Sequence, residues 1–342
     1  MAGGIGSRFW PMSTPEYPKQ FVDVLGRGMS MIQMTVERFA PLCPIENMWV
    51  VTSADYEALV REQLPHLPVE NILLEPAMRN TAPCIAYACW KIRQKDPSAN
   101  VVVTPADALV VDVDDFRKVI SRALDFTAAD KRIVTIGICP TRPETGYGYI
   151  AAGAEVSAGE VKVLKVDSFR EKPAIEVARE YLAAGNYLWN AGIFVWNVDT
   201  IVESIRAFVP DLAAKMDTMS ESFYTPDERV TVGKIFPTCE KISIDYAVME
   251  KADYIYTIPG DFGWSDVGTW GSLWTLLDHD EDGNAVVGEN VHLNDCKGCI
   301  VHAQGARSVV LQGLEDSIVV ERDGRLLVCR LSEEQRIKDF VK

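Results

Sequence analysis

The chain has 342 residues, 48% hydrophobic and 24% charged, which is typical of a globular protein with one large and one small domain. Its 34 basic and 49 acidic side chains give a formal net charge of -15, which argues against nucleic acid and anionic membranes as partners. No secretory signal opens the sequence, and no apolar run is long enough to span a bilayer. We therefore expect no nucleic-acid or membrane partner, and any anionic substrate must be held by locally placed cations.

The eight cysteines are scattered through apolar runs, a pattern typical of buried, reduced thiols in a cytoplasmic protein. Cys296 and Cys299 form a CxxC pair, but no second pair follows, and His292 and His302 lack the spacing of metal ligands. We therefore expect a cytoplasmic protein without a zinc site.

The first part of the chain alternates predicted strands with helices. Short apolar or β-branched runs predict strands at residues 47–52, 72–74, 101–104 and 133–138. The stretch 81–92 is apolar on nearly every side and predicts a buried helix, with Pro83 in its first turn. This alternation predicts an α/β fold with a mostly parallel sheet, helices on both faces, and ligands at the carboxyl ends of the strands.

The middle of the chain is richer in predicted strands, and the end changes character. Strands are predicted at 149–152, 161–166 and 193–196, and helices at 199–208 and 243–250. From Asn284 onward, short apolar runs recur between turn residues, at 286–287, 299–301, 309–311, 318–320 and 326–329. We therefore predict a large domain over residues 1–283 and a small all-β domain over 284–342, whose apolar runs could form a homodimer contact.

A glycine-rich stretch stands at the start of the chain, directly after Met1 and Ala2. Glycine lets backbone N–H groups approach phosphate, but this stretch lacks the Gly-Lys-Ser/Thr ending of a Walker A loop. It is not the dinucleotide fingerprint either, because Phe9 replaces the third glycine. Taken alone, it fits a plain turn about as well. A phosphate-binding loop normally follows a strand, so we expect the natural chain to begin several apolar residues earlier, and a chain starting at Met1 to have a frayed loop and poor activity.

A series of short motifs runs in order over nearly the whole chain. They are Gly3-Gly4-x-Gly6-x-Arg8, Phe9-Trp10-Pro11, Pro18-Lys19-Gln20-Phe21, Glu75-Pro76-x-x-Arg79-Asn80-Thr81-Ala82-Pro83, Pro105-Ala106-Asp107, Pro143-Glu144-Thr145-Gly146-Tyr147-Gly148-Tyr149-Ile150, Phe169-Arg170-Glu171-Lys172-Pro173, Trp189-Asn190-Ala191-Gly192-Ile193-Phe194, Ser243-Ile244-Asp245-Tyr246-Ala247-Val248-Met249-Glu250 and Trp264-Ser265-Asp266-Val267-Gly268-x-Trp270. The series resembles the sugar-phosphate nucleotidyltransferase family and, within it, the mannose-1-phosphate guanylyltransferase branch. It departs from the family at Ala106 and Ala108, which flank the retained Asp107 where the family more often has Ser and His.

The resemblance implies a Rossmann-like mixed, mostly parallel sheet of the glycosyltransferase-A-like nucleotidyltransferase type, with a small C-terminal domain like a left-handed β-helix. It assigns the nucleotide, GTP, to Gly3, Gly4, Gly6, Ser7, Arg8, Lys19, Glu75, Arg79, Asn80 and Thr81. It assigns the sugar phosphate to Gly146, Tyr147, Gly148, Glu171, Lys172 and Asn190. The side-chain chemistry is consistent with this assignment. Lys172 can neutralise a phosphate, Glu171 can accept hydrogen bonds from hydroxyls, and Asn190 can both donate and accept hydrogen bonds. Without the family context, Lys19 fits a solvated surface lysine and Glu171–Lys172 a surface ion pair.

Two carboxylates are expected to hold Mg²⁺. Asp107 follows a buried predicted strand, and Asp266 lies in a loop with glycine and tryptophan. Mg²⁺ takes few protein ligands and completes its shell with phosphate oxygens and water, so two carboxylates beside a triphosphate suit it. Taken singly, Asp107 fits a helix cap and Asp266 a turn residue, and the resemblance is what favours the metal role.

The reaction implied by the resemblance transfers GMP from GTP to mannose 1-phosphate and releases pyrophosphate, with Arg8, Lys19, Asp107, Lys172 and Asp266 as the catalytic residues. The attacking phosphate is already an anion, so catalysis is expected from alignment and charge stabilisation, not from a general base. Three alternatives stay open: transfer from another nucleotide, guanylyl transfer to another sugar 1-phosphate such as a heptose, and a non-catalytic sensor with the same fold. No histidine-rich cluster of the kind found in an added isomerase domain is present, so a single activity is expected.

Overall fold

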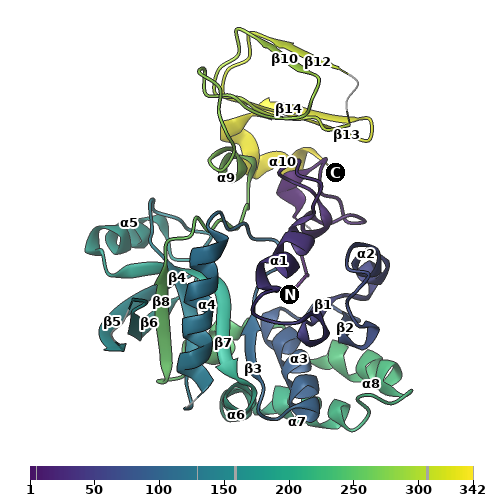
Figure 1. The fold of residues 1–342 in the computed structure, drawn as a ribbon, viewed down its shortest axis with the longest axis vertical. Helices are drawn as coiled ribbons and strands as arrows, with labels where there is room; N and C mark the ends of the chain where they lie inside the picture. The colour runs from purple at the N-terminus through teal and green to yellow at the C-terminus, as the bar shows by residue number, and fades with distance from the viewer. Residues whose placement is uncertain (5, 129, 158–159, 306–307, 342) are drawn as a thin grey trace.

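A six-stranded sheet organises the larger part of the molecule (Figure 1). The computed structural model describes residues 1–4, 6–128, 130–157, 160–305 and 308–341, and within them the strand order is β3-β7-β4-β8-β6-β5. The strands are β3 (Asn100–Val103), β4 (Ile133–Ile138), β5 (Tyr149–Ser157), β6 (Val163–Arg170), β7 (Tyr187–Asn197) and β8 (Ile255–Gly260). Because β7 also pairs with β5, the strands β5, β6, β8, β4 and β7 close on themselves.

The sheet is mixed, as expected, but the prediction that it is mostly parallel is wrong. β4 and β8 run parallel, whereas β7 runs antiparallel to β3, β4 and β5. β6 is likewise antiparallel to β5 and β8. The long strand β7 comes from the middle of the chain and enters between β3 and β4, two strands that share one direction. Alternation in the sequence reports which elements follow one another, but it does not report which strands become neighbours.

Helices cover both faces of the sheet, as predicted. The α-helices of the described residues are α1 (Met31–Phe39), α2 (Glu57–Gln63), α3 (Thr81–Lys95), α4 (Val113–Ala128), α5 (Ile175–Ala184), α6 (Val198–Phe208), α7 (Pro210–Ser220), α8 (Glu228–Ile235), α9 (Trp270–Trp274) and α10 (Ile337–Phe340). The last two, α9 and α10, lie beside the C-terminal strands and not on this sheet. Alternate residues of β7 enter two separate cores, because successive side chains of a strand point to opposite faces. Phe194 and Trp196 lie in the core with α3 and α6, and Ile193 and Val195 lie in the core with α4.

The helix predicted at 81–92 is α3, which begins at Thr81 and ends at Lys95. The side chain of Asn80 accepts a hydrogen bond from the Thr81 N–H and so caps the helix, and Pro83 lies in the first turn. The apolar character of α3 on every side has a physical reason, because it packs against both α6 and α7.

Two further strands, β1 (Val50–Ser53) and β2 (Ile72–Glu75), form a separate parallel pair beside the main sheet. Ala2 makes a parallel bridge to Thr52 of β1, and it leads directly into the glycine-rich stretch. The segment just ahead of the glycines therefore lies alongside β1.

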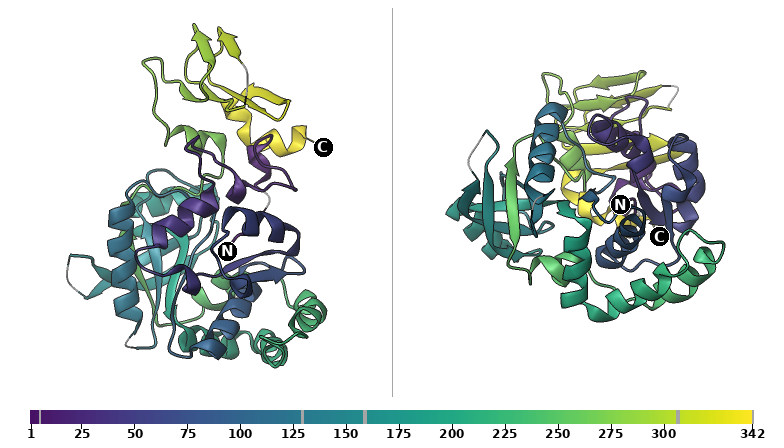
Figure 2. Two further views of the ribbon diagram at one scale, coloured as in Figure 1. Left: turned by 45° about the vertical axis from the view of Figure 1, so that its right-hand side comes forward. Right: turned by 60° about the horizontal axis from the view of Figure 1, so that its bottom comes forward.

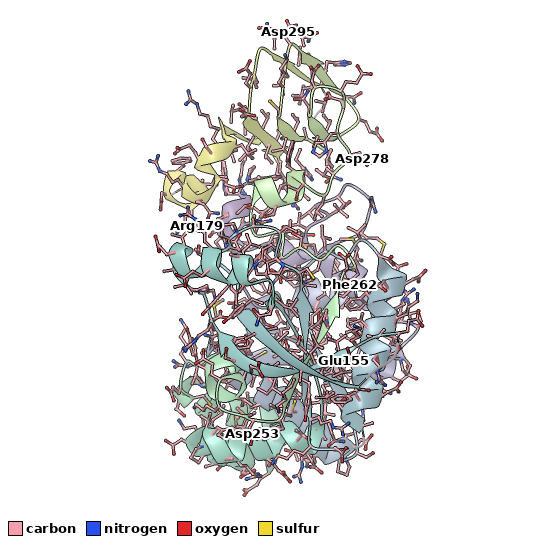
Figure 3. All side chains as sticks on the ribbon, turned by 90° about the vertical axis from the view of Figure 1, so that its left-hand side faces the viewer. Glu155, Arg179, Asp253, Phe262, Asp278 and Asp295 are labelled. Atoms are coloured by element: carbon pink, nitrogen blue, oxygen red, sulfur yellow. The ribbon has the colours of Figure 1, made fainter. Side chains whose placement is uncertain are left out.

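The C-terminal strands form a small unit at one end of the molecule (Figure 2). They are β9 (Ala285–Val287), β10 (Val291–Asn294), β11 (Ile300–His302), β12 (Val309–Gln312), β13 (Ser317–Arg322) and β14 (Arg325–Arg330). Sequence analysis identified all of these but β10, whose polar residues leave no continuous apolar run. In Figure 3, Asp278 lies where the two parts join and Asp295 lies at the far end of the unit. Ile318 and Ile337 pack against Phe9 and Trp270, so this unit rests directly on the segment that follows the glycines.

All eight cysteines are unpaired thiols, and five of them are buried, in agreement with the sequence prediction. Burial raises the pKa of Cys89 to about 12, so this thiol stays protonated. Within the described parts of the chain, no helix combines the length and apolarity needed to cross a bilayer.

Candidate active site

A cavity of about 450 Å³ lies where the glycine-rich segment meets the loops that follow β3, β6 and β8. It is lined by Gly6, Ser7, Arg8, Phe9, Lys19, Pro105, Asp107, Ala108, Gly146, Tyr147, Gly148, Glu171, Asn190, Ala191, Gly192, Asp245, Trp264, Asp266, Val267 and Gly268. Most of the predicted site residues therefore meet in one place, although they come from segments far apart in the sequence. The cavity lies at the carboxyl ends of several strands, where ligands bind in α/β sheets.

Lys19 is the central charge at one end of this cavity. It begins a short 3₁₀ helix (Lys19–Phe21), and only 5% of its side chain is exposed. Its Nζ lies 3.1 Å from Asp107 Oδ2 and donates to the backbone carbonyls of Asp266 at 2.7 Å and Val267 at 3.1 Å. Lys19 is therefore a buried cation that joins the two predicted metal-binding loops, and the alternative of a solvated surface lysine is wrong.

The carboxylate of Asp266 is held in one orientation. Its Oδ1 accepts hydrogen bonds from the Tyr147 hydroxyl at 2.6 Å and from the Gly268 N–H at 2.9 Å. A Cβ at Gly268 would lie 2.7 Å from Asp266 Oδ2, so glycine is needed beside this carboxylate. Burial and the charge of Asp266 raise the pKa of Tyr147 above its usual range, so the phenol remains a hydrogen-bond donor.

Asp107 and Asp266 fit a hard divalent cation by their chemistry. Both line the same cavity, and 38% of the Asp107 side chain is exposed to a ligand that enters it. No cluster of three or more carboxylate, histidine or cysteine ligands occurs among the described residues. Two carboxylates are the donor set that Mg²⁺ uses when substrate phosphates and water supply its remaining ligands.

The glycine-rich segment reaches the cavity through Gly6, Ser7 and Arg8. Gly6 has a φ of 63°, and a Cβ there would lie 2.7 Å from the Cβ of Lys19, so this position requires glycine. Arg8 is exposed and donates to Gln335 of the C-terminal unit at 3.2 Å. Gly3 and Gly4 are exposed and do not line the cavity, and Ile5 lies outside the described residues.

The other end of the cavity gathers polar side chains around Asn190. Its Oδ1 accepts from the Thr135 hydroxyl at 3.0 Å and the Gly192 N–H at 3.1 Å, and its Nδ2 donates to Asp245 Oδ1 at 3.1 Å. These three bonds fix the amide orientation. A Cβ at Gly148 would lie 2.6 Å from Glu171 Oε2, so glycine makes room for that carboxylate.

Asp245 is a site residue that the sequence analysis did not assign. It opens a π-helix (Asp245–Met249), and burial, followed by the charge of Glu171, raises its pKa to about 6. Its motif was recognised, but nothing in the spacing of residues 243–250 distinguished the aspartate from a surface position. The signal that could have found it is an acidic residue ahead of an apolar helix within a motif.

Lys172 lies beside the cavity and does not line it. Its Nζ is 2.5 Å from Glu171 Oε1, and 61% of its side chain is exposed. Burial lowers the pKa of Lys172, but the hydrogen bond to Glu171 and the charges of Glu171 and Asp245 outweigh it, so the pKa lies above its usual value. The ammonium is therefore charged and is held at the rim by Glu171.

The segment predicted to lie near the base is placed at the start of α3, and none of its members lines the 450 Å³ cavity. Arg79 donates to the carbonyl of Pro237, and the Thr81 hydroxyl accepts from the Ile244 N–H at 2.9 Å. Burial raises the pKa of Glu75 to about 7, and the nearby N-terminal amine opposes that shift. Asn80 has a φ of 68° and caps the helix.

Comparison with known proteins identifies the family. The family profile described as nucleotidyl transferase matches residues 1–283. The whole chain is 37% identical over 352 residues to the mannose-1-phosphate guanylyltransferase of Escherichia coli K12, covering 72% of that protein. It is 38% identical over 348 residues to the enzyme of that name from Salmonella montevideo, again covering 72% of the relative.

A crystal structure from Thermus thermophilus, described as a mannose-1-phosphate geranyltransferase, has the same fold. It superposes with a TM-score of 0.88 at 32% identity, over 100% of this chain and 96% of that one. The Rossmann-like α/β class is thereby confirmed. Because the family profile covers residues 1–283 and these two relatives are 37% and 38% identical to the chain over the aligned residues, this chain belongs to the nucleotidyl transferase family.

Proposed function

We propose that this enzyme transfers GMP from GTP to mannose 1-phosphate and so makes GDP-mannose and pyrophosphate. The observation that carries the proposal is the division of one 450 Å³ cavity into two ends. One end holds a buried lysine and two carboxylates, and the other holds an amide with acidic neighbours. The names of the curated relatives, mannose-1-phosphate guanylyltransferases, support this choice of nucleotide and sugar.

The residues at the charged end would bind the triphosphate and align its α-phosphorus. The N–H groups around Gly6 and Ser7, with Lys19 and Arg8, supply positive charge to the phosphates. Asp107 and Asp266 would hold Mg²⁺, which supplies charge neutralisation at the phosphates when bound. Tyr147 keeps Asp266 in position through its hydroxyl.

At the polar end, Lys172 at the rim would attract the phosphate of the sugar substrate. Asn190, Glu171 and Asp245 would receive the sugar hydroxyls, because a fixed amide and two carboxylates offer both donors and acceptors. The attacking phosphate oxygen is already anionic, so the enzyme contributes alignment and charge compensation and needs no base. Glu75, Arg79, Asn80 and Thr81 would face the guanine from the start of α3.

The test is a pyrophosphate-release assay with purified enzyme, GTP, mannose 1-phosphate and Mg²⁺. ATP, UTP and dTTP replace GTP in parallel reactions, and glucose 1-phosphate and a heptose 1-phosphate replace the sugar. We expect GTP with mannose 1-phosphate to give the highest kcat/KM, and release to require the metal. Faster turnover with another nucleotide or sugar phosphate would overturn the assignment, and no release with any pair would favour a sensor.

We further propose that the residues after Asn284 wind as a left-handed β-helix and contribute a homodimer contact. Support for the winding comes from stacked parallel pairing: β9 pairs with β11 and β11 with β13, while β10 pairs with β12. A parallel bridge between Lys297 and Glu315 adds a third side. Val310, Leu326 and Val328 are exposed on this unit and offer apolar surface to a second copy. Sedimentation analysis tests the dimer.

A further inference from the structure

A short segment of the C-terminal unit, residues 331–340, packs beside the phosphate end of the active-site cavity. It consists of a 3₁₀ helix (Leu331–Arg336) followed by α10. The structure describes this whole segment, and none of its residues lines the cavity. The segment nevertheless contacts the 3₁₀ helix Ser7–Phe9, which carries Arg8, and α9, which follows the Asp266 loop (Figure 1).

The backbone of this segment is anchored at both ends. Ile337 is fully buried and lies in one apolar cluster with Phe9 and Trp270, whose rings are 4.8 Å apart. At the other end, the Leu331 N–H donates to Asp316 O at 2.7 Å. Close packing and backbone hydrogen bonds leave such a segment little freedom to move. The side chains between the two anchors therefore project from fixed positions.

Glu334 reaches the segment that carries Asp266. Its Oε2 accepts a hydrogen bond from the Gly271 N–H at 2.7 Å, and the lack of a side chain at Gly271 lets the carboxylate approach this closely. N–H groups in the first turn of a helix have no partner within the helix, so the carboxylate satisfies one of them in α9. Gly271 lies three residues after Gly268, whose N–H donates to Asp266 Oδ1. Glu334 thus holds the chain at the point where the Asp266 loop ends.

Gln335 reaches the other side of the phosphate end, through Arg8. Its Oε1 accepts from Arg8 Nη1 at 3.2 Å, and both side chains are exposed. No other hydrogen bond or ion pair within the described residues involves the Arg8 side chain. A guanidinium has five N–H donors, so this bond can direct the group and still leave most donors for a phosphate. An amide carries no charge, so it orients the cation without neutralising it.

We propose that Glu334 and Gln335 are positioning residues for the phosphate end of the site. Gln335 directs Arg8 toward the triphosphate, and Glu334 holds the Asp266 loop on the other side. Because the two residues are adjacent on one anchored backbone, they fix the distance between two segments that lie far apart in the sequence. This inference rests on the proposed function, since it takes a nucleoside triphosphate as the ligand of Arg8.

The first test measures the binding of GTP in the presence of Mg²⁺ by titration calorimetry. Gln335→Ala should raise Kd about fivefold, because Arg8 loses the bond that directs it. Gln335→Glu should raise Kd more, about twentyfold, because a carboxylate pairs with Arg8 and repels the triphosphate. Gln312→Ala, which removes an exposed amide from β12 of the same unit, should leave Kd unchanged.

A double-mutant cycle separates a positioning role from a structural one. In an Arg8→Ala background, Gln335→Ala should cause no further rise in Kd, because its effect passes through Arg8. An equal rise with and without Arg8 would overturn the proposal. A smaller rise for Gln335→Glu than for Gln335→Ala would also overturn it, since a carboxylate at this position must compete with the phosphates.

The second test compares two substitutions at Glu334. Glu334→Ala removes the acceptor for Gly271, so kcat should fall about tenfold and half-maximal activity should need more Mg²⁺, because the loop that carries Asp266 shifts. Glu334→Gln keeps an acceptor oxygen and should restore most of kcat. Glu333→Ala is the control, because Glu333 pairs with Arg336 inside the segment. Equal losses in Glu334→Gln and Glu334→Ala, or normal kcat in both, would overturn the role of Glu334.

The binding titration needs no turnover, so it separates this inference from the proposed function. A chain that binds GTP but releases no pyrophosphate would overturn the proposed function and leave the coupling between Arg8 and Gln335 measurable. An active chain whose Gln335 variants all bind GTP as tightly as the original would overturn the positioning role alone. If another nucleoside triphosphate supports release, the titration uses that nucleotide, and no binding of any of them would overturn both.

Discussion

The two ends of the active-site cavity hold their charges in different ways. At the phosphate end, Lys19 is buried and makes three polar contacts, and Asp266 is bonded by both Tyr147 and Gly268. At the sugar end, Lys172 is largely exposed and forms an ion pair with its neighbour Glu171. A preorganised charge can stabilise a transition state without reorganisation, whereas an exposed pair is screened by solvent. If the proposed function is right, we expect the phosphate end to carry catalysis and the sugar end to carry selectivity.

Lys19→Ala should give the largest effect and is the strongest test of this comparison. Turnover should fall about a thousandfold, because the variant removes a preorganised cation at the phosphates. Tm should fall as well, because Asp107 and two backbone carbonyls lose their partner. Pyrophosphate release and thermal melts measure the two effects.

Arg8→Ala is the matched control for that loss, since Arg8 lines the same cavity but is exposed and bonded to Gln335. Its turnover should fall less, and its Tm should change little. Equal losses of turnover and Tm in the two variants would contradict the distinction between a buried and an exposed cation.

Tyr147→Phe should give the next largest effect. It removes the hydroxyl that donates to Asp266 Oδ1 at 2.6 Å and leaves the rest of the ring in place. Hydrogen bonds to charged groups are worth roughly 1.5–3 kcal/mol, so kcat should fall about thirtyfold with an altered Mg²⁺ dependence. Tyr181→Phe is the control, because Tyr181 stacks on Tyr187 outside the cavity. An unchanged metal titration for Tyr147→Phe would show that this hydroxyl does not orient the carboxylate.

Asp245→Asn should weaken the binding of the sugar phosphate and leave the binding of GTP unchanged. It removes an acceptor beside Asn190 at the polar end, so KM for mannose 1-phosphate should rise about fivefold while KM for GTP stays the same. Steady-state kinetics with each substrate varied in turn measure both constants. Asp253 is exposed at the lower end of the large domain in Figure 3 and does not line the cavity, so Asp253→Asn should change neither constant. A rise in KM for GTP would contradict the assignment of the two substrates to separate ends of the cavity.

Asp245→Asn should also have a small effect on the pH dependence of Tm. The folded-state pKa of Asp245 is raised from 3.8 to about 6, chiefly by burial. The folded protein therefore holds this proton more tightly than the unfolded chain, and the resulting stabilisation is present below pH about 4 and lost as pH rises through about 6. Asp245→Asn cannot ionise, so it should raise Tm by about 2 °C at pH 8 and leave Tm unchanged at pH 4. Thermal melts at the two pH values would contradict the shifted pKa if the gain were equal at both.

Much of the fold was predictable where burial is complete. The strand predicted at 133–138 is β4, and all six of its residues are buried, so its apolar run was an unambiguous signal. The strand β10 escaped detection because its residues alternate between exposed and half-buried positions and include polar side chains. The alternation of strands and helices along the sequence could not predict that β7 runs antiparallel to its neighbours. The reason is that β7 pairs with strands that lie far from it in the sequence.

The sequence by itself determined the chemistry of the site: which side chains carry charge, which positions are glycine, and that Lys19, Asp107 and Asp266 belong to one ordered set of motifs. Only the tertiary structure decided that Lys19 is buried between Asp107 and the Asp266 loop, and that β1 and β3 line one cavity. The physical reason is the separation along the chain over which each effect acts. Residue type and local pattern act over a few positions, whereas burial and strand pairing depend on which distant surfaces pack together.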